Sequence, residues 1–413
     1  MKHKLTNLCI LIIVFILLFM NNLEISYANS NNKPSIESEA ALLIDNKTGK
    51  ILYEKNASKK MYPASTTKIM TAILTLENCN LNDIITASYN AVQSVPEGYA
   101  NAEIQIGEQL SVKQLLQLLL VHSANDSANV LAEHVGGSID SFVSMMNTKA
   151  HELGLSNTHF TNAFGKQDSN HYTTAHDLAT ILQYCLKNDD FRQLAGSASC
   201  SIPATNLHSI RQYSSTNDLI NPNSNLYYKY LTTGKTGFTT EAGDCLVSSA
   251  YKNDLELICV ILGGKTTNNV STRFTETKKL YDYGYNNFSV NQIVSKDDVI
   301  IQIQVQNATK ETQDLNLIAE SSISALVPNE ISTNSLTPEI NLNENISAKI
   351  DEGTILGTAT YKIDNTEYTT NLLASHDVLE SFSIPFSILN IGIIVIALLA
   401  TYLIFFHKSK NSK

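Results

Sequence analysis

The stretch YPASTTKIMTA (Tyr62–Ala72) decides how the chain is interpreted, because it places a serine and a lysine three residues apart, just after a proline. Apolar residues follow with helical spacing, so the pattern predicts that a helix begins at Ser65. Residues three apart on a helix share a face, which brings Ser65 and Lys68 within hydrogen-bond reach. The Ser-x-x-Lys pattern also occurs at Ser30 and Ser249, so the motif taken alone favours a helix cap beside a surface lysine.

Two further short motifs follow in chain order. Ser123-Ala-Asn125 interrupts two apolar segments, where a polar break can project both side chains into a cleft. Lys235-Thr-Gly237 lies on a predicted strand whose glycines allow a ligand backbone to approach and pair with the strand edge. Taken singly, Ser123-Ala-Asn125 also fits an ordinary interhelical turn, and Lys235-Thr-Gly237 also fits an edge strand with a bulge.

The three motifs together indicate nucleophilic catalysis. A lysine of normal pKa, about 10.4, is charged at neutral pH and cannot accept a proton from Ser65. Burial and a second nearby cation both lower that pKa, and Lys235 is the natural second cation for Lys68. Ser123 could then relay the proton to the leaving group, and the backbone N–H groups of Ser65 and Phe238 could form an oxyanion hole.

Motifs of these types in this order resemble those of penicillin-recognising serine enzymes, and in particular the D-alanyl-D-alanine carboxypeptidases among the low-molecular-mass penicillin-binding proteins. The resemblance extends over roughly Ser38 to Phe288. It is carried by YPASTTKIMTA, HSANDSANVLAEHVGG, MNTKAHELGLSNTHFTNAFG, HYTTAHDLA, GKTGFTTEAGDCLVSSA and STRFTETKKLYDYGYNNF. It implies an α+β fold: a penicillin-binding-protein/β-lactamase-like catalytic domain with an antiparallel sheet flanked by helices, a small all-β domain, and a C-terminal transmembrane helix.

The same resemblance implies the role of each site residue. Ser65 would be the acylated nucleophile and Lys68 its general base, with no cofactor. The other residues would line the cleft or bind substrate, and they are Ser123, Asn125, Lys235, Thr236, Gly237 and Arg273. Arg273 would lie near the terminal carboxylate of the substrate, which suits the paired donors of a guanidinium. The chain departs from the family in NAFGK (Asn162–Lys166), where relatives usually carry proline and leucine on either side of the glycine.

The expected activity is therefore a serine-type carboxypeptidase that removes the terminal D-alanine from peptidoglycan stem peptides and is acylated by β-lactams. A serine β-lactamase is one alternative, but a class A enzyme needs an added glutamate, and no clear equivalent lies between Asn125 and Lys235. A wall-binding relative without turnover is a second alternative, against which the intact motifs argue. A third alternative, which stays open, is that endopeptidase activity on cross-links exceeds carboxypeptidase activity.

The termini predict an extracytoplasmic protein. Met1–Lys4 is basic, Leu8–Met20 is apolar, and Ser26-Tyr27-Ala28 provides small residues for signal-peptide cleavage, although an uncleaved anchor is the alternative. Ile384–Phe406 is long and apolar enough for a membrane span, and a basic tail follows it. The expected parts are a signal peptide at 1–28, a flexible lead at 29–38, a catalytic domain at 39–289, a β domain at 290–375, a linker at 376–383, a transmembrane anchor at 384–406 and a cytoplasmic tail at 407–413.

Periodicity predicts the order of the elements. A β-hairpin at 40–56 comes first, then helices beginning near residues 65, 111, 126, 139 and 174, then strands at 227–238, 244–251 and 255–262, and a helix at 271–285. Ser111 and Ser138 are the predicted N-caps, and Gly136-Gly137 and Gly154 are predicted helix stops. That order favours one sheet built from both ends of the segment.

Composition limits the kinds of partner, disulfide and metal site that the chain is expected to have. A formal net charge of −10 argues against nucleic acid. Of six cysteines, Cys9 leaves with the signal, and the remaining five show no CxxC spacing, so neither a disulfide framework nor a zinc site is expected. Cys245 and Cys259 lie in apolar strand-like runs and are expected to be core residues. The ten histidines show no convincing ligand spacing.

Overall fold

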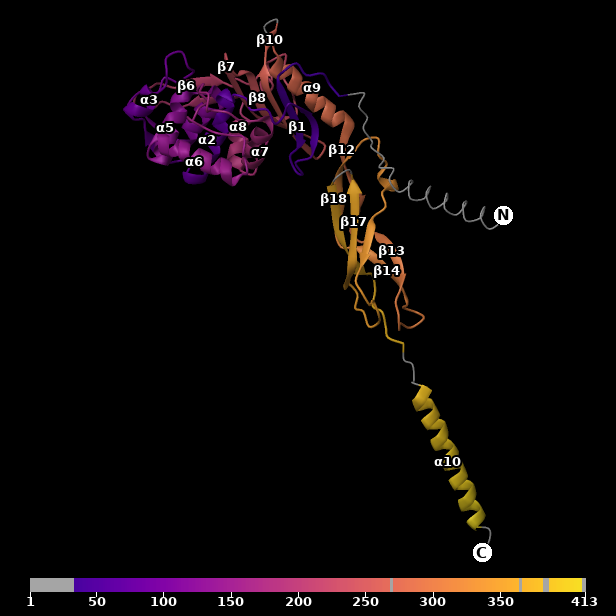
Figure 1. Cartoon of the computed structure of the whole chain (residues 1–413). Coiled ribbons are helices and arrows are strands. Elements are labelled where there is room, and N and C mark those ends of the chain that lie inside the picture. Colours follow the sequence, from indigo (N-terminus) through magenta and orange to yellow (C-terminus); the bar gives the residue numbers. More distant parts are fainter. Residues whose placement is uncertain (1–32, 268–269, 364–365, 382–385, 411–413) are drawn as a thin grey trace, which may run out of the picture. The chain divides into compact units, whose positions relative to one another are not determined.

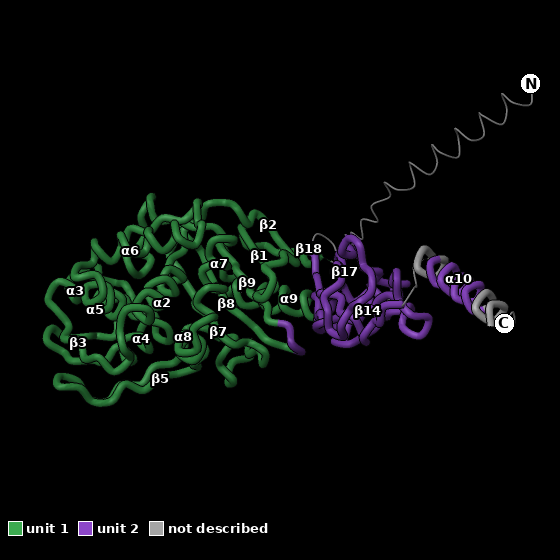
Figure 2. Tube along the Cα trace, turned by 90° about the horizontal axis from the view of Figure 1, so that it is seen from below, with its two compact units in different colours: residues 1–252, 256–285 green, residues 253–255, 286–413 purple. Residues whose placement is uncertain are grey.

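The computed structural model describes residues 33–267, 270–363, 366–381 and 386–410 (Figure 1). The chain divides into two compact units, residues 1–252 with 256–285 and residues 253–255 with 286–413 (Figure 2). The three short motifs that begin at Ser65, Ser123 and Lys235 all lie in the first unit.

A five-stranded antiparallel sheet forms the centre of the first unit. Its strand order is β2-β1-β9-β8-β7. The strands are β1 (Ala40–Asp45), β2 (Ile51–Lys55), β7 (Leu231–Thr239), β8 (Gly243–Lys252) and β9 (Leu255–Gly264). The pairing of β1 with β9, from Ala40 opposite Leu262 to Asp45 opposite Leu257, joins the two ends of the unit in one sheet, as the element order predicted. β7, which carries the Lys-Thr-Gly motif, is an edge strand.

The two faces of this sheet pack against different helices. Along β1, Leu42 belongs to the helical core, whereas the next residue, Leu43, approaches Gly284 of helix α9 (Thr272–Asn287). Successive strand side chains point to opposite faces, so the continuous apolar run of β1 is a strand buried on both sides. Figure 1 shows α9 on one side of the sheet and the other helices of the unit on the opposite side.

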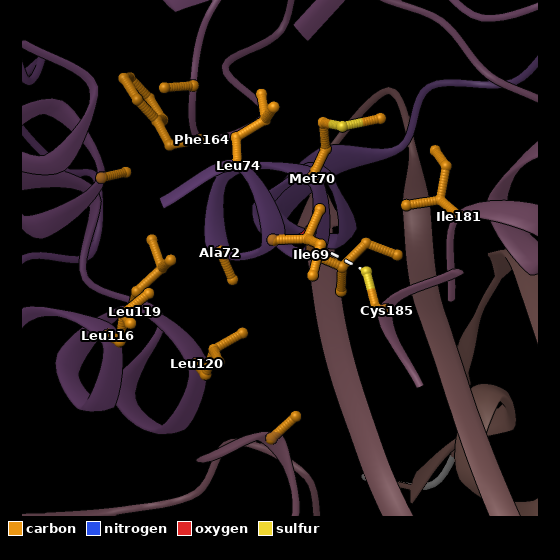
Figure 3. Close-up of a cluster of buried hydrophobic side chains, with 14 of the residues drawn as sticks. Ile69, Met70, Ala72, Leu74, Leu116, Leu119, Leu120, Phe164, Ile181 and Cys185 are labelled. Carbon is orange, nitrogen blue, oxygen red and sulfur yellow. Dashed lines mark hydrogen bonds between the residues drawn. The ribbon is translucent and has the colours of Figure 1, made fainter. Parts of the chain in front are cut away.

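Helix α2 (Lys68–Asn78) lies within the helical layer and is buried along most of its length. Around it are α4 (Val112–Gln117), a π-helical turn (Leu118–His122), α5 (Asn125–Gly136), α6 (Ile139–Glu152), α7 (Ala175–Cys185) and α8 (Asp189–Ala195). Figure 3 shows Ile69 and Ala72 of α2 among the side chains of this core, with the Cys185 thiol 3.7 Å from the Ile69 carbonyl oxygen. Because the first two turns of α2 are buried, they fix the position of Lys68, its first residue.

Local signals in the sequence mark several helix ends correctly. Ser111 caps α4 through a capping box with Gln114, and Ser138 caps α6 by accepting the Ser141 N–H. Gly137 and Gly154 follow α5 and α6 with φ values of 73° and 74°, which glycine adopts at little cost. These predicted caps and stops are confirmed.

Short elements complete the first unit. They are a 3-10 turn at Ala64–Thr67, α3 (Tyr89–Gln93), and the strand pairs β3 (Ile84–Thr86) with β4 (Gln109–Ser111), β5 (Ser199–Ile202) with β6 (Arg211–Ser214), and β10 (Thr266–Thr267) with β11 (Val270–Ser271). Cys245 and Cys259 are fully buried in the central sheet, as expected. The five cysteines among the described residues are all free thiols.

In its described residues, the second unit contains strands, a 3-10 turn at Thr333–Ser335 and the helix α10. β12 (Phe288–Val294) pairs with β15 (Ile323–Pro328). A five-stranded sheet has the order β13-β14-β18-β17-β16, with β13 (Val299–Gln304), β14 (Asp314–Ala319), β16 (Glu339–Leu342), β17 (Ile355–Ile363) and β18 (Thr366–Ala374). Its core includes Leu315, Leu317, Ala359 and Leu372, all fully buried. The expected all-β unit is confirmed, whereas the predicted turn at 364–365 lies outside the described residues.

The predicted C-terminal membrane span is corrected by the structure. A helix, α10 (Phe386–Lys410), does form there, and it continues past Phe406 into the sequence predicted as a tail. Across the described residues, however, no helix meets the length and hydropathy required to cross a membrane. The predicted signal peptide at 1–28 lies outside the described residues.

Candidate active site

Ser65 lies in the 3-10 turn Ala64–Thr67, one turn before α2, and not in the α-helix itself. Two glycines surround this turn closely. A Cβ on Gly165 would lie 1.8 Å from the Ala64 carbonyl oxygen, and a Cβ on Gly237 would lie 2.9 Å from the Ser65 nitrogen. Ala64 itself has a φ of 45°, which is uncommon for a residue other than glycine. The backbone of the serine is therefore held by close contacts on both sides.

Lys68 is fully buried and its ammonium has three oxygen partners. Its Nζ donates to Ser65 Oγ at 2.8 Å, to Asn125 Oδ1 at 2.5 Å and to the Phe164 carbonyl at 3.0 Å. The first distance lies within the hydrogen-bond reach that the three-residue spacing predicted. Burial lowers the pKa of Lys68 well below its usual value, and the positive charge of Lys235 lowers it further. A group with these properties can exist as a neutral amine beside a serine hydroxyl.

The structural surroundings of Ser65 differ from those of the serines in the other Ser-x-x-Lys patterns. Ser249 and Lys252 both lie on strand β8, where residues three apart point to opposite faces of the sheet. Ser249 Oγ bonds instead to the hydroxyls of Thr232 and Thr233. Ser30 lies outside the described residues. Among the described copies of the pattern, only Ser65 has its lysine as a hydrogen-bond partner.

Ser123 and Lys235 form a second serine–lysine pair. Lys235 is buried, and its Nζ donates to Ser123 Oγ at 3.0 Å and to the Thr236 carbonyl at 2.9 Å. Ser123 ends the π-helical turn in the left-handed region, with a φ of 67°, which turns its side chain towards β7. Burial lowers the pKa of Lys235 to about 7, and the charge of Arg273 adds to that shift.

The edge strand β7 contributes the remaining predicted residues. Thr236 Oγ1 lies 2.6 Å from Thr216 Oγ1. Arg273, on α9, donates from Nη1 to the Gly237 carbonyl at 2.9 Å and lies 3.4 Å from an Asp244 carboxylate oxygen. Its buried Nε has no hydrogen-bond partner among the described residues. Phe238 follows the motif with its side chain 63% exposed.

A cleft of about 410 Å³ opens at these residues. Ser65 and Asn125 lie in the lining of this cleft. The rest of the lining comes from three chain segments, which are 98–100, part of 164–167 and 238–241. The first segment precedes a loop that is held by Asp126, whose buried carboxylate accepts the N–H groups of Ala102 and Ile104. The pKa of Asp126 is raised by burial, against which these backbone hydrogen bonds act.

The sequence analysis missed the contributions of backbone groups. The NAFGK loop does more than set local shape, because the Phe164 carbonyl accepts a hydrogen bond from Lys68 and Gly165 packs against the serine turn. Asn162 fixes the loop through Oδ1, which accepts the N–H groups of Gly165 and Lys166, both at 2.8 Å. A carbonyl oxygen has no residue-type signature, but an asparagine followed by a glycine three residues later is a turn signal that could have drawn attention to the loop.

The buried His171 also has a structural role. Its Nδ1 accepts the Thr161 N–H at 3.0 Å, and its Nε2 lies 2.8 Å from the Thr67 hydroxyl, next to Lys68 in the chain. Burial lowers the pKa of His171 to about 4, which favours the neutral ring in this arrangement. In the described part of the chain, there is no group of three or more His, Cys, Asp or Glu side chains that could bind a metal ion together.

Comparison with known families matches both units. The model described as D-alanyl-D-alanine carboxypeptidase covers residues 27–266, and the model described as penicillin-binding protein 5, C-terminal domain, covers residues 288–380. These two matches follow the order of the two units along the chain.

Individual proteins agree with the family models. The D-alanyl-D-alanine carboxypeptidase DacF of Bacillus subtilis is 31% identical over 79% of this chain and 82% of its own length. The corresponding protein DacC of Escherichia coli is also 31% identical, over 80% of this chain and 81% of its own length. The crystal structure of penicillin binding protein 5 from Haemophilus influenzae superposes with a TM-score of 0.65 at 26% identity, over 84% of this chain and 99% of that chain.

Proposed function

This chain belongs to the D-alanyl-D-alanine carboxypeptidase family and is a serine-type hydrolase, and we propose that Ser65, Lys68 and Ser123 carry out its reaction. The observation that carries the assignment is a pair of buried lysines, each bonded to a serine hydroxyl. One of these serines also lies in the lining of the cleft. The family acts on D-Ala-D-Ala termini, so the expected substrate is a peptidoglycan stem peptide.

Acylation begins at Ser65. The neutral amine of Lys68 takes the hydroxyl proton across the 2.8 Å contact, while Ser65 Oγ attacks the carbonyl of the penultimate D-alanine. The N–H groups of Ser65 and Phe238 are proposed to stabilise the negative charge on the carbonyl oxygen. Ser123 passes its proton to the departing amine and is reprotonated by the proton that Lys68 took, so the terminal D-alanine leaves as a neutral amine and Lys68 is again a neutral amine.

Deacylation reverses the proton movements. Water attacks the ester carbonyl and gives a proton to Lys68, and the proton then returns to Ser65 Oγ as the ester bond breaks. β-Lactams fit the same scheme because their strained amide places a carbonyl where the peptide carbonyl would lie. The product peptide carries a new terminal carboxylate on the former penultimate D-alanine.

Substrate binding is assigned to the β7 edge and its neighbours. A peptide that adds to this edge forms backbone hydrogen bonds along the strand. Lys235 and Thr236 are proposed to hold its terminal carboxylate, with Arg273 adding positive charge and Gly237 permitting close approach. Asn125 would hold a substrate amide while its Oδ1 orients Lys68. The expected substrate and the signal sequence predicted at 1–28 both favour action outside the cytoplasm.

The test is D-alanine release from a peptide that ends in Lys-D-Ala-D-Ala. We expect release by the parent and a loss on the order of 10⁴ or more in Ser65→Ala, as for removal of other nucleophiles. Ser249→Ala is the matched control, because it changes the other described Ser-x-x-Lys serine, on β8, and it should retain activity.

Three results would contradict the proposal. Covalent labelling of Ser65→Ala by penicillin would exclude Ser65 as the nucleophile. Rapid turnover of a chromogenic β-lactam by the parent would favour a β-lactamase. Absence of D-alanine release by a folded parent would favour a wall-binding relative without turnover.

A further inference from the structure

The lining of the active-site cleft contains a single charged side chain, that of Glu241. Glu241 is exposed and directly follows Thr239 and Thr240, where β7 turns towards β8. No hydrogen bond or ion pair involves its carboxylate within the described ranges of the chain. A carboxylate at the rim of a substrate cleft, with no partner of its own, is available to a ligand.

The direction of the substrate places one particular group near this carboxylate. With the terminal carboxylate at Lys235 and Thr236 and the scissile carbonyl at the Phe238 N–H, the peptide runs along β7 towards Thr239. A strand advances about 3.3 Å per residue, so the residue that precedes D-Ala-D-Ala lies beside 239–241. A side chain about 6 Å long, such as that of lysine, can span the remaining gap to the rim.

We propose that Glu241 is a specificity-determining residue that recognises a free ammonium group on the side chain preceding D-Ala-D-Ala. This inference rests on the proposed function of the cleft. It predicts a preference for stem peptides whose side-chain amine is free over peptides in which that amine is acylated, as it is in a cross-link or an acetylated analogue. The enzyme would then act preferentially on stems that have not been cross-linked through this amine.

Lys166 is the group that competes with this interpretation. It is exposed and belongs to the same loop as Phe164, Gly165 and Gln167, but its side chain is not part of the cleft lining. If Lys166 controlled recognition, a free ammonium would be repelled and the acylated peptide would be preferred. The sign of the preference therefore decides between the two residues.

The experiment compares kcat/KM for two peptides, Nα-acetyl-Lys-D-Ala-D-Ala and its Nα,Nε-diacetyl analogue, at low salt. Because Glu241 is exposed, the preference of the parent for the free amine should be about two- to fivefold, the range of an exposed ion pair. Glu241→Gln should reduce that ratio to about one, and Glu241→Lys should invert it. Salt should weaken the preference of the parent in the same way.

Glu103→Gln is the matched control, because it makes the same change at an exposed glutamate outside the cleft lining, and it should keep the ratio of the parent. Equal rates of the parent on both peptides, a preference for the diacetyl peptide, or a ratio unchanged in Glu241→Gln would overturn the inference and leave the proposed function standing. Release of D-alanine from neither peptide would overturn both.

Discussion

Lys68 illustrates how burial lowers the pKa of an ordinary lysine side chain. Its ammonium has oxygen partners on Ser65, Asn125 and Phe164, and among the described residues no carboxylate lies within hydrogen-bond distance of it. Hydrogen bonds to neutral oxygens offset only part of the cost of removing a charge from water, so the neutral amine is favoured. The positive charge of Lys235 adds repulsion, which lowers the pKa of Lys68 further.

The first prediction concerns the proton-accepting role of Lys68. Lys68→Arg keeps a positive charge but cannot release a proton, so acylation by labelled penicillin should fall by roughly 10²- to 10⁴-fold. The measurement is the rate of covalent labelling, with circular dichroism to show that the fold is retained. Lys68→Met, which fills the same space without charge, should be equally impaired. Near-normal labelling by the arginine variant would remove Lys68 from the role of base.

The second prediction uses the lowered pKa of Lys235, about 7. Below that pH the amine is protonated and can bind the substrate carboxylate, and above it the charge is lost. The kcat/KM for a D-Ala-D-Ala peptide, which reports the free enzyme, should therefore fall by about tenfold per pH unit once the pH exceeds this value. In Lys235→Arg the guanidinium stays charged, so the decline should move to higher pH. A decline at the same pH in both proteins would assign it to another group.

At the scale of elements, close packing of loops against the 3-10 turn sets the position of Ser65. The third prediction is that Gly165→Ala, whose Cβ would meet the Ala64 carbonyl at 1.8 Å, displaces the serine. Displacements near 1 Å in a catalytic group cost about 10²-fold, so acylation should fall by roughly that factor.

Gly154→Ala is the control for backbone strain in this comparison. Gly154 also has a positive φ, 74°, but a Cβ there would meet nothing within 4 Å. Both variants therefore carry the cost of a left-handed alanine, and only Gly165→Ala adds a clash with the serine turn. Equal acylation rates in the two variants would show that the contact at Gly165 does not position Ser65.

The sequence predicts correctly those elements that have strong local signals, and it predicts wrongly the elements whose bounds depend on tertiary packing. The capped helices α4 and α6 lie where Ser111 and Ser138 predicted them. The predicted strand start at Tyr227 is wrong, since β7 begins at Leu231 and Tyr228 instead stacks on Tyr281 of α9. Aromatic residues favour strands in general, but here packing between distant segments takes precedence. α8 was missed because seven residues give too short a periodic signal.

The candidate active site also contains features that the sequence predicts and features that it does not. Ser65 and Lys68 could be proposed as nucleophile and base because that chemistry requires particular residue types at a fixed spacing. The Phe164 carbonyl and the segment at 98–100 were not, because backbone groups and cleft walls can be built from almost any residue. Glu241 has a charge but no motif, so its position at the cleft became visible only with the fold.

At the scale of the whole molecule, the two units have separate hydrophobic cores. The core of the first unit draws on residues between Ala40 and Leu262, and the main core of the second draws on residues between Val294 and Val378, with no member in common. Every residue assigned to the reaction, including Arg273 on α9, lies in the first unit. Segments of these sizes, each with its own core, are long enough to fold independently.

The fourth prediction is therefore that the fragment 29–285 folds and is acylated by labelled penicillin at a rate within about twofold of the full chain. The fragment 286–381 should unfold cooperatively on its own, because its buried β-sheet core needs no residue of the first unit. Thermal unfolding of each fragment provides the test of folding, and Ser65→Ala in the 29–285 fragment provides the baseline for labelling. A folded 29–285 fragment with acylation slowed tenfold or more would mean that the second unit shapes the active site, and an unfolded fragment would mean that the separate cores do not confer separate stability.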